Sequence, residues 1–427
     1  MQTTNVIHAH LTYIEENIKA IVTIEEIADM AGYSVSHYGR LFAQVTGLSV
    51  AAYIGKRRLD RALGEIIGGR RAIDVALDYG FDTYAGFYKA FVRMYGNSPK
   101  SYLKKEMKLM LTEKQLRDIL THWDIPQDLP ILDVYIMDGT KIASNVWSIG
   151  EEYILKTDGR EAMLQNLRVA GALAKQGFAA ATPVLTKSGT EYLGLDGEKI
   201  TVLTRGIKGS PLTKADRFGN GRRAFGYKYG ESIARLHNAL AAIESEIKLH
   251  DHNLYREVAD WALPETKKQN IQFQMGLPDG FFDGYMQRFG AVYDALPKQL
   301  IHRDPNPGNI LFDGGEVSGF IDFDLSRRTA RLLDPCYCAT GILVEWHGVD
   351  GLHEKWPDIL EGILHGYDSV NPLTAEEKQS VFDIICSMQM ICIAYFESQN
   401  ELKALAKTNR EMLQFIAAKQ ARIASIF

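Results

Sequence analysis

The stretch HRDPNPGNILFDGGEVSGFIDFD, residues 302–324, is the most informative segment for the architecture of the larger part of the chain. It places Asp304 and Asn309 in one polar cluster and Asp322 in a second. The segment between them, ILFDGGEVSGFI, predicts two strands joined by a Gly-Gly turn, which would hold the clusters in a fixed relation. Phosphoryl transfer from a nucleotide needs a base near the acceptor hydroxyl and hard oxygen ligands for magnesium near the phosphates. The pattern therefore predicts Asp304 as the base, and Asn309 and Asp322 as magnesium ligands.

The residues around this stretch predict an α+β domain with two lobes. Residues 131–207 alternate strand-like runs and glycine-bearing turns with one helix, REAMLQNLRVAGALAKQG. Residues 208–427 are mainly helical, and 222–240 (RRAFGYKYGESIARLHNAL) form the clearest helix. A helical bridge over 106–130 precedes both lobes, and its pattern ends at two prolines. A small sheet followed by a helical lobe is typical of nucleotide-using transferases of the protein-kinase architecture.

Across residues 111–425 the chain resembles the aminoglycoside phosphotransferase and choline-kinase-like family. The segments that carry the resemblance are LIHRDPNPGNILFD, VSGFIDFDLS, LLDPCYCAT and GESIARLHNAL. The family pattern H-x-D-x-x-P-x-N is complete in His302, Asp304, Pro307 and Asn309. The resemblance implies a Mg²⁺-dependent transfer from ATP or GTP to the hydroxyl of a small molecule.

The resemblance also implies where the nucleotide binds. Lys156 in YILKT would contact the phosphates, and backbone groups of the segment from Leu203 to Gly206 would bind the nucleobase. The family usually offers a glutamate to pair with this lysine, but Asn166 stands where we expect it. Glu161, a little more than one helical turn earlier, is the substitute that the sequence offers.

A second pattern lies in the first hundred residues, which contain a repeat. IEEIADMAGYSVSHYGRLFAQVTGLS (24–49) corresponds to AIDVALDYGFDTYAGFYKAFVRMYGNS (72–98), so that Gly32 recurs as Gly80, 48 residues later. Each unit predicts a short helix, a turn at glycine and a second helix, capped by Ser34 or Asp82. The segment between the two units predicts an amphipathic helix. The repeat therefore predicts an all-α domain with two helix-turn-helix modules on one connector.

Residues 5–105 resemble the AraC/XylS family of DNA-binding domains, on both units and the closing G-x-S-P-x-x-Y motif. The resemblance implies that the second helix of each unit lies in a major groove. Gly39 and Gly86 are unexpected inside the presumed recognition helices, because glycine lowers helix stability and offers no contact with DNA bases. Residues 1–105 carry a net charge of +3 and the remainder −8, a sign that suits DNA at this end. The residues expected to face DNA are Ser36, His37, Arg40, Tyr84, Ala85 and Lys89.

These patterns predict a multidomain protein: residues 1–105 bind DNA, 106–130 form the bridge, and 131–207 and 208–427 form the lobes. One hypothesis is a transcriptional regulator fused to a small-molecule kinase, which would include a resistance kinase. The alternative is a ligand- or nucleotide-sensing transcription factor whose kinase-like domain has little or no catalysis. A protein kinase is a weaker reading, because the chain has no Ala-Pro-Glu segment and no Gly-rich loop.

The expected partners are double-stranded DNA and a small molecule with a hydroxyl group, such as an aminoglycoside, an amino alcohol or a sugar. A pocket for a cationic amine or sugar is expected from acidic and aromatic residues after Asp324, such as Glu345, Trp346, Tyr367 and Asp368. No apolar run approaches the length of a transmembrane helix, and the four cysteines form no CxxC pair. We therefore expect a reduced, cytoplasmic protein without a membrane partner, for which a homodimer is compatible with the sequence.

Overall fold

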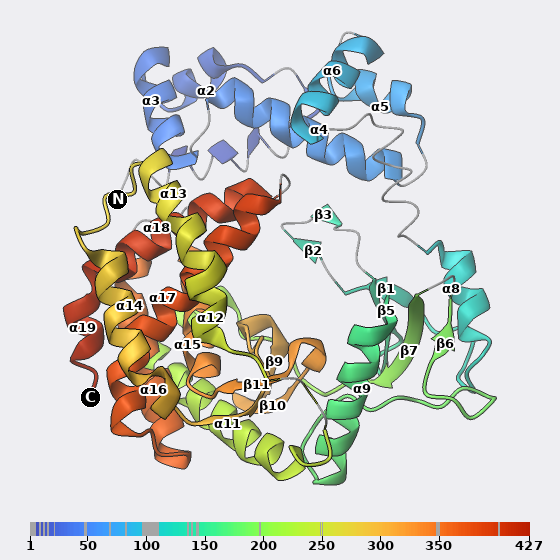
Figure 1. The fold of residues 1–427 in the computed structure, drawn as a ribbon. Coiled ribbons are helices and arrows are strands. Elements are labelled where there is room, and N and C mark those ends of the chain that lie inside the picture. The colour runs from blue at the N-terminus through green and yellow to red at the C-terminus, as the bar shows by residue number, and fades with distance from the viewer. Residues whose placement is uncertain are drawn as a thin grey trace. The chain divides into compact units, whose positions relative to one another are not determined.

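The computed structural model divides the chain into two compact units, residues 1–150 and 151–427, which are described separately (Figure 1). It describes residues 6–427 except 8–9, 12, 15–16, 21, 47–48, 68–69, 82, 96–110, 135, 138–139, 142–144, 196–197, 248, 250, 347–350 and 400–401. The predicted cap Asp82 and the closing motif of the first domain lie outside these residues. The predicted domain boundaries stay a prediction.

The first unit is helical over its larger part, as the repeat predicts. A single apolar core runs through both helix-turn-helix modules and includes the buried aromatic rings of Tyr38, Phe42, Phe87 and Phe91. The antiparallel strand pairs β1–β4 and β2–β3 follow the helices in this unit. Its elements are α2 (Ile24–Met30), α3 (Val35–Thr46), α4 (Val50–Ile67), α5 (Ala72–Asp78), α6 (Tyr84–Tyr95), α8 (Glu113–Leu120), β1 (Ile131–Asp133), β2 (Ile136–Met137), β3 (Thr140–Lys141) and β4 (Val146–Ile149).

The two modules turn at equivalent glycines. Gly32 has a φ of +69° and Gly80 a φ of +75°, a left-handed conformation that only glycine adopts without strain. Ser34 accepts a hydrogen bond from the amide of His37 at 3.3 Å, which confirms it as the cap of α3. In the second module Thr83 does the same for the amide of Gly86 at 3.1 Å.

The second unit combines a small sheet with a helical lobe (Figure 1). Strands β5, β7 and β6 pair antiparallel, and α9 follows β5 directly. The sheet and the helices that begin this unit are β5 (Tyr153–Gly159), α9 (Arg160–Lys175), β6 (Leu193–Gly194), β7 (Lys199–Arg205), α10 (Lys214–Phe218), α11 (Arg222–Ile243), α12 (Leu254–Glu257), η1 (Val258–Ala262), α13 (Leu263–Gln272) and α14 (Phe281–Val292).

The rest of this unit carries the stretch 302–324 and the helices around it. Strand β8 pairs with β11, and β9 pairs with β10 across the predicted Gly-Gly turn. Its elements are η2 (Tyr293–Ala295), β8 (Lys298–Ile301), η3 (Pro307–Asn309), β9 (Ile310–Asp313), β10 (Glu316–Phe320), η4 (Phe323–Leu325), β11 (Arg327–Ala330), α15 (Leu333–Leu343), η5 (Val344–Trp346), η6 (His353–Lys355), α16 (Trp356–Val370), α17 (Ala375–Ser398), α18 (Lys403–Ala418) and α19 (Gln420–Ala424).

Helices α11 and α16 pack backbone to backbone in this lobe. A Cβ atom added at Gly230 would lie 1.8 Å from the carbonyl oxygen of Ile363, and one added at Gly366 would lie 2.0 Å from that of Tyr227. No side chain fits at either position, so the glycines set the distance between the two helices. This contact helps to fix α11, which carries His237 into the polar network described below.

Among the described helices one, α17, is long and apolar enough to cross a membrane. In its most apolar window 72% of the residues are buried inside the protein.

Candidate functional site

One buried carboxylate fixes the backbone of the loop that carries Asp304. Asp334, at the start of α15, accepts hydrogen bonds from the amides of His302 and Arg303, both at 2.9 Å. The same carboxylate contacts Nε2 of His237 at 2.8 Å. Arg303 has a φ of +70°, which is unusual for a residue with a side chain. The Asp334 carboxylate therefore fixes a strained backbone directly before Asp304.

Two amide side chains donate hydrogen bonds to the carboxylate of Asp304. Nδ2 of Asn306 donates to one carboxylate oxygen of Asp304 at 3.0 Å, and Nδ2 of Asn309 donates to the other at 3.1 Å. The carbonyl oxygen of Asn309 accepts from the amide of Ile321 at 3.1 Å, directly before Asp322. The hairpin β9–β10 thus brings Asp304, Asn309 and Asp322 to one place, as the spacing predicts.

Asp322 begins a second fixed loop. Its φ is +72°, again a left-handed conformation without a glycine. The next residue, Phe323, donates its amide hydrogen to Oδ1 of Asn166 at 2.8 Å. Gln165, the neighbour of Asn166 on α9, donates to the carbonyl oxygen of Ser326 at 3.0 Å. Helix α9 therefore holds this loop through two amide side chains, which gives the unexpected Asn166 a role.

Lys156 on β5 forms an ion pair and hydrogen bond with Asp322. The predicted pairing of Lys156 with Glu161 is not found: Glu161 is exposed in the first turn of α9. Burial would lower the pKa of Lys156, but the charge of Asp322 and its hydrogen bond outweigh this and raise the pKa. Lys156 is therefore positively charged beside the predicted magnesium ligand.

A third carboxylate, Asp324, shares this region. Burial, followed by the negative charge of Asp322, raises its pKa to about 6, although Lys156 acts in the opposite direction. Binding of a cation here would reduce the electrostatic repulsion between these carboxylates and favour their charged forms.

The predicted magnesium ligands fit a hard cation. Both Asp322 and Asn309 present oxygen atoms, and the amide nitrogen of Asn309 is already bound to Asp304, so that its side chain has only its oxygen to offer. The described residues contain no cluster of three or more His, Cys, Asp or Glu side chains arranged as a metal site. Asn309 and Asp322 are therefore the two side chains that would hold magnesium here, and the ion would supply positive charge beside the nucleotide phosphates.

The backbone groups predicted to bind the base are already paired in part. The carbonyl oxygen of Leu203 accepts from the amide of Val184 at 2.8 Å. The amide of Gly206 donates to the carbonyl oxygen of Glu152, also at 2.8 Å. A contact with the nucleobase of ATP or GTP in this segment would have to use other backbone groups, because these two belong to the sheet and its edge.

The residues predicted to face DNA lie on α3 and α6. Tyr84 differs from the others: its side chain is half-buried and packs against the rings of Phe87 and Tyr88. Gly39 has a packing reason, because a Cβ at this position would lie 3.3 Å from Cδ1 of Ile24 on α2. The residues with exposed side chains are Ser36, His37, Arg40, Ala85 and Lys89.

The expected cationic pocket after Asp324 is wrong. Glu345 forms an ion pair with Arg217, and Tyr367 is buried with its hydroxyl 2.7 Å from Nδ1 of His237. Asp368 accepts from the amide of Leu373 at 2.7 Å. These side chains have structural partners, and the side chain of Trp346 lies outside the described residues.

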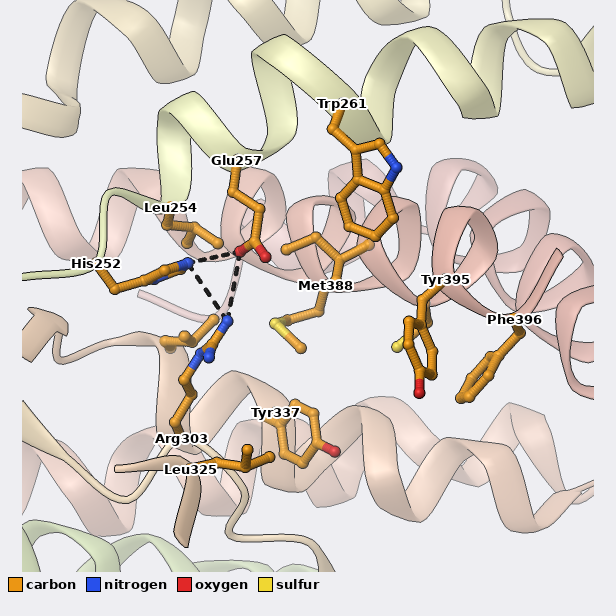
Figure 2. A pocket seen from close by; sticks show the side chains of 13 residues that line it. His252, Leu254, Glu257, Trp261, Arg303, Leu325, Tyr337, Met388, Tyr395 and Phe396 are labelled. Atoms are coloured by element: carbon orange, nitrogen blue, oxygen red, sulfur yellow. Dashed lines mark hydrogen bonds and ion pairs between the residues drawn. The ribbon is translucent and has the colours of Figure 1, made fainter. Parts of the chain in front are cut away.

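A cavity of about 470 Å³ lies elsewhere in the helical lobe, between α12, η1, α15 and α17. Arg303, the neighbour of Asp304, and Tyr337 on α15 line it (Figure 2). Its residues come from four distant segments, and no spacing in the sequence pointed to them.

Comparisons with known proteins find a matching family for each of the two parts of the chain. A model of a helix-turn-helix domain matches residues 27–105, and a model of the phosphotransferase enzyme family matches residues 140–376. The transposon Tn10 TetD protein of Escherichia coli is 32% identical over 105 residues, which are 24% of this chain and 76% of that protein.

The second part of the chain has relatives of its own. Homoserine kinase of Neisseria meningitidis serogroup B is 29% identical over 210 residues, 48% of this chain and 62% of that enzyme. The chain thus spans less than two thirds of this relative. The structure of amicoumacin kinase hAmiN in complex with AMP-PNP, Ca²⁺ and Ami aligns over 73% of this chain and 96% of that chain, with a TM-score of 0.52 and 18% identity, a likeness of fold. The chain belongs to the phosphotransferase enzyme family, with an AraC-type helix-turn-helix domain preceding its kinase-like domain.

Proposed function

We propose that residues 151–427 transfer the terminal phosphoryl group of ATP or GTP to a hydroxyl group of a small molecule. The observation that carries this proposal is that Asp304 and Asn309 on one fixed loop, Asp322 on a second fixed loop and Lys156 on β5 lie together. Such fixed positions matter because phosphoryl transfer relies mainly on orientation and on charge stabilisation.

Asp304 acts as the base in this proposal. The oxygen of the acceptor hydroxyl forms a bond to the γ-phosphorus, the bond from that phosphorus to the bridging oxygen breaks, and the nucleoside diphosphate leaves. The proton of the hydroxyl passes to the Asp304 carboxylate, which Asn306 and Asn309 orient. Lys156 holds the nucleotide phosphates once it has exchanged its contact with Asp322 for them. Asn309 and Asp322 would hold a magnesium ion, which would supply positive charge for the transferring group.

The first unit binds double-stranded DNA in this proposal, with α3 and α6 in successive major grooves. The exposed positions of Arg40 and Lys89 on these helices support it. The protein then combines a transcriptional regulator with a small-molecule kinase in one cytoplasmic chain.

The test is release of nucleoside diphosphate by the full-length protein from Mg-ATP and Mg-GTP, with homoserine, choline, sugars, aminoglycosides and apolar alcohols as acceptors. We expect acceptor-dependent turnover that Asp304→Asn lowers by about 10²- to 10⁴-fold, the usual contribution of a general base. Asp313→Asn, an exposed carboxylate on the hairpin, is the matched control and should keep its turnover. Full turnover in Asp304→Asn would refute the assignment of the base. Nucleotide binding without any turnover would favour the sensor alternative.

A further inference from the structure

The cavity in the helical lobe lies next to the predicted base. Arg303 lines it and directly precedes Asp304 in the chain. Two further lining residues are close enough to respond to the Asp304 carboxylate: burial, and then the charge of Asp304, raises the pKa of Tyr337 and raises that of Cys392 to about 12. A hydroxyl group presented at this end of the cavity would therefore be near the base.

The walls of the cavity are mainly aromatic and aliphatic (Figure 2). Trp261, Leu325 and Tyr395 line it although their exposed fractions are 38%, 45% and 49%. Large apolar side chains that gather around one hollow instead of in the core are typical of a ligand site. Met388 and Phe396 on α17 extend the same surface, and Figure 2 shows Phe396 at the end away from His252.

The charges that line the cavity are already balanced. Among the described residues that line the cavity Glu257 is the only carboxylate, and one of its oxygens lies 2.7 Å from Nε2 of His252 and 3.5 Å from Nη2 of Arg303. Burial would raise the pKa of Glu257, but the hydrogen bond from His252 and the charges of His252 and Arg303 lower it below its usual value. A polycationic ligand would need several unpaired carboxylates in the lining, but the charge of Glu257 is already balanced by His252 and Arg303.

We infer that the acceptor is an uncharged, largely apolar molecule with an aromatic or fused-ring body and one hydroxyl group, bound in this cavity. This inference rests on the proposed function. The ring system packs against Trp261 and Tyr395, and the hydroxyl group points toward Asp304. The reaction remains the one above: the hydroxyl oxygen bonds to the γ-phosphorus, its proton goes to Asp304, and nucleoside diphosphate leaves. Aminoglycosides and choline are then poor ligands, because Glu257, the one carboxylate among the described lining residues, is already paired with His252 and Arg303.

Two measurements on the full-length protein test the inference. Isothermal titration calorimetry measures binding of 2-naphthaleneethanol, 9-anthracenemethanol, kanamycin and choline to the protein with a bound non-hydrolysable nucleotide. Release of nucleoside diphosphate measures which of the four is an acceptor. The variants are Trp261→Ala and Tyr395→Ala, whose side chains are partly exposed, so that the fold should survive. Tyr227→Ala is the matched control, because Tyr227 is 40% exposed on α11 and does not line the cavity.

We expect saturable binding of at least one of the two aromatic alcohols and none of kanamycin or choline. Trp261→Ala and Tyr395→Ala should each weaken that binding by about tenfold, because each removes apolar contact area, whereas Tyr227→Ala should not. Turnover of kanamycin or choline, absence of binding by both aromatic alcohols, or equal binding in all variants would each overturn the inference.

The calorimetry also separates this inference from the proposed function. Binding of an aromatic alcohol that needs Trp261 and Tyr395, without any turnover, would support the cavity and refute the kinase. Turnover of a charged acceptor, lost in Asp304→Asn, would support the kinase and refute the apolar acceptor.

Discussion

The two units place their predicted functional residues in opposite surroundings. On α3 and α6 of the first unit, Arg40 and Lys89 are exposed, and the core beneath them is formed by other residues. In the second unit the backbone is left-handed at Arg303, directly before Asp304, and at Asp322 itself, and the side chains of Asp334 and Asn166 hold the two loops. A DNA-facing helix needs only a stable scaffold, whereas a phosphoryl-transfer site needs each loop fixed. Substitutions should therefore affect stability very differently in the two units, and the predictions below are ordered by that effect.

The largest loss of stability is expected for Asp334→Ala. It would leave two amides and His237 without their buried acceptor, and breaking such a buried polar network typically lowers the free energy of unfolding by about 3–5 kcal/mol. Urea unfolding of the full-length protein measures the change. Asp313→Ala is the control, because its partner Lys208 is 85% exposed and such surface pairs contribute about 0–1 kcal/mol. Equal effects of the two substitutions would contradict the comparison.

Asn166→Ala should have a smaller effect on stability and a specific effect on the site. The amide of Phe323 would lose its acceptor, which lowers the free energy of unfolding by about 1–3 kcal/mol. Because the loop of Asp322 would then be less fixed, the KM for the Mg-nucleotide should rise while DNA binding stays unchanged. Asn238→Ala removes an exposed amide contact in the same unit and should leave KM unchanged. An unchanged KM in Asn166→Ala would show that the side chain has only a structural role.

The two modules of the first unit can be compared with each other through their turn glycines. Gly32→Ala and Gly80→Ala force a side chain into a left-handed conformation, which costs about 1–2 kcal/mol. Gly80→Ala should cost more, because its Cβ would lie 3.1 Å from Nη1 of Arg58, whereas a Cβ at Gly32 meets nothing within 4 Å. Gly55→Ala in α4 should have the opposite sign, since alanine is the better helix former and the position is open. Hydrogen exchange of residues in α4 and α5 measures these differences.

The sequence predicted those parts of the site that lie close together in the chain. Asp304, Asn309 and Asp322 fall within 19 residues, and a hairpin with a Gly-Gly turn brings them together. The equivalent glycines Gly32 and Gly80 were likewise visible as a repeat, because each turn is a local backbone requirement. Local rules therefore sufficed for the two modules and for the hairpin.

The parts that sequence reasoning missed depend on contacts between distant segments. Asn166 looked like a missing glutamate, because its contact with Phe323 spans 157 residues. The acceptor pocket was placed wrongly at Glu345 and its neighbours, because Arg217, far away in the chain, neutralises that carboxylate. A cavity lined by both His252 and Phe396 has no period or motif that a sequence can show.

The smallest effect on stability is expected for Arg40→Ala and Lys89→Ala, and it completes the comparison. Both side chains are exposed, so each substitution should change the free energy of unfolding by less than about 0.5 kcal/mol. Each should nevertheless weaken DNA binding and reduce the slope of log affinity against log salt concentration by about one, as expected for a lost phosphate contact. Fluorescence anisotropy with a labelled random-sequence duplex at several salt concentrations measures the slope, with Lys114→Ala on α8 as the matched control. If the two variants bind DNA like the control, the DNA-facing assignment of α3 and α6 is wrong. If they also unfold more easily, these residues belong to the scaffold, and the contrast between the two units does not hold.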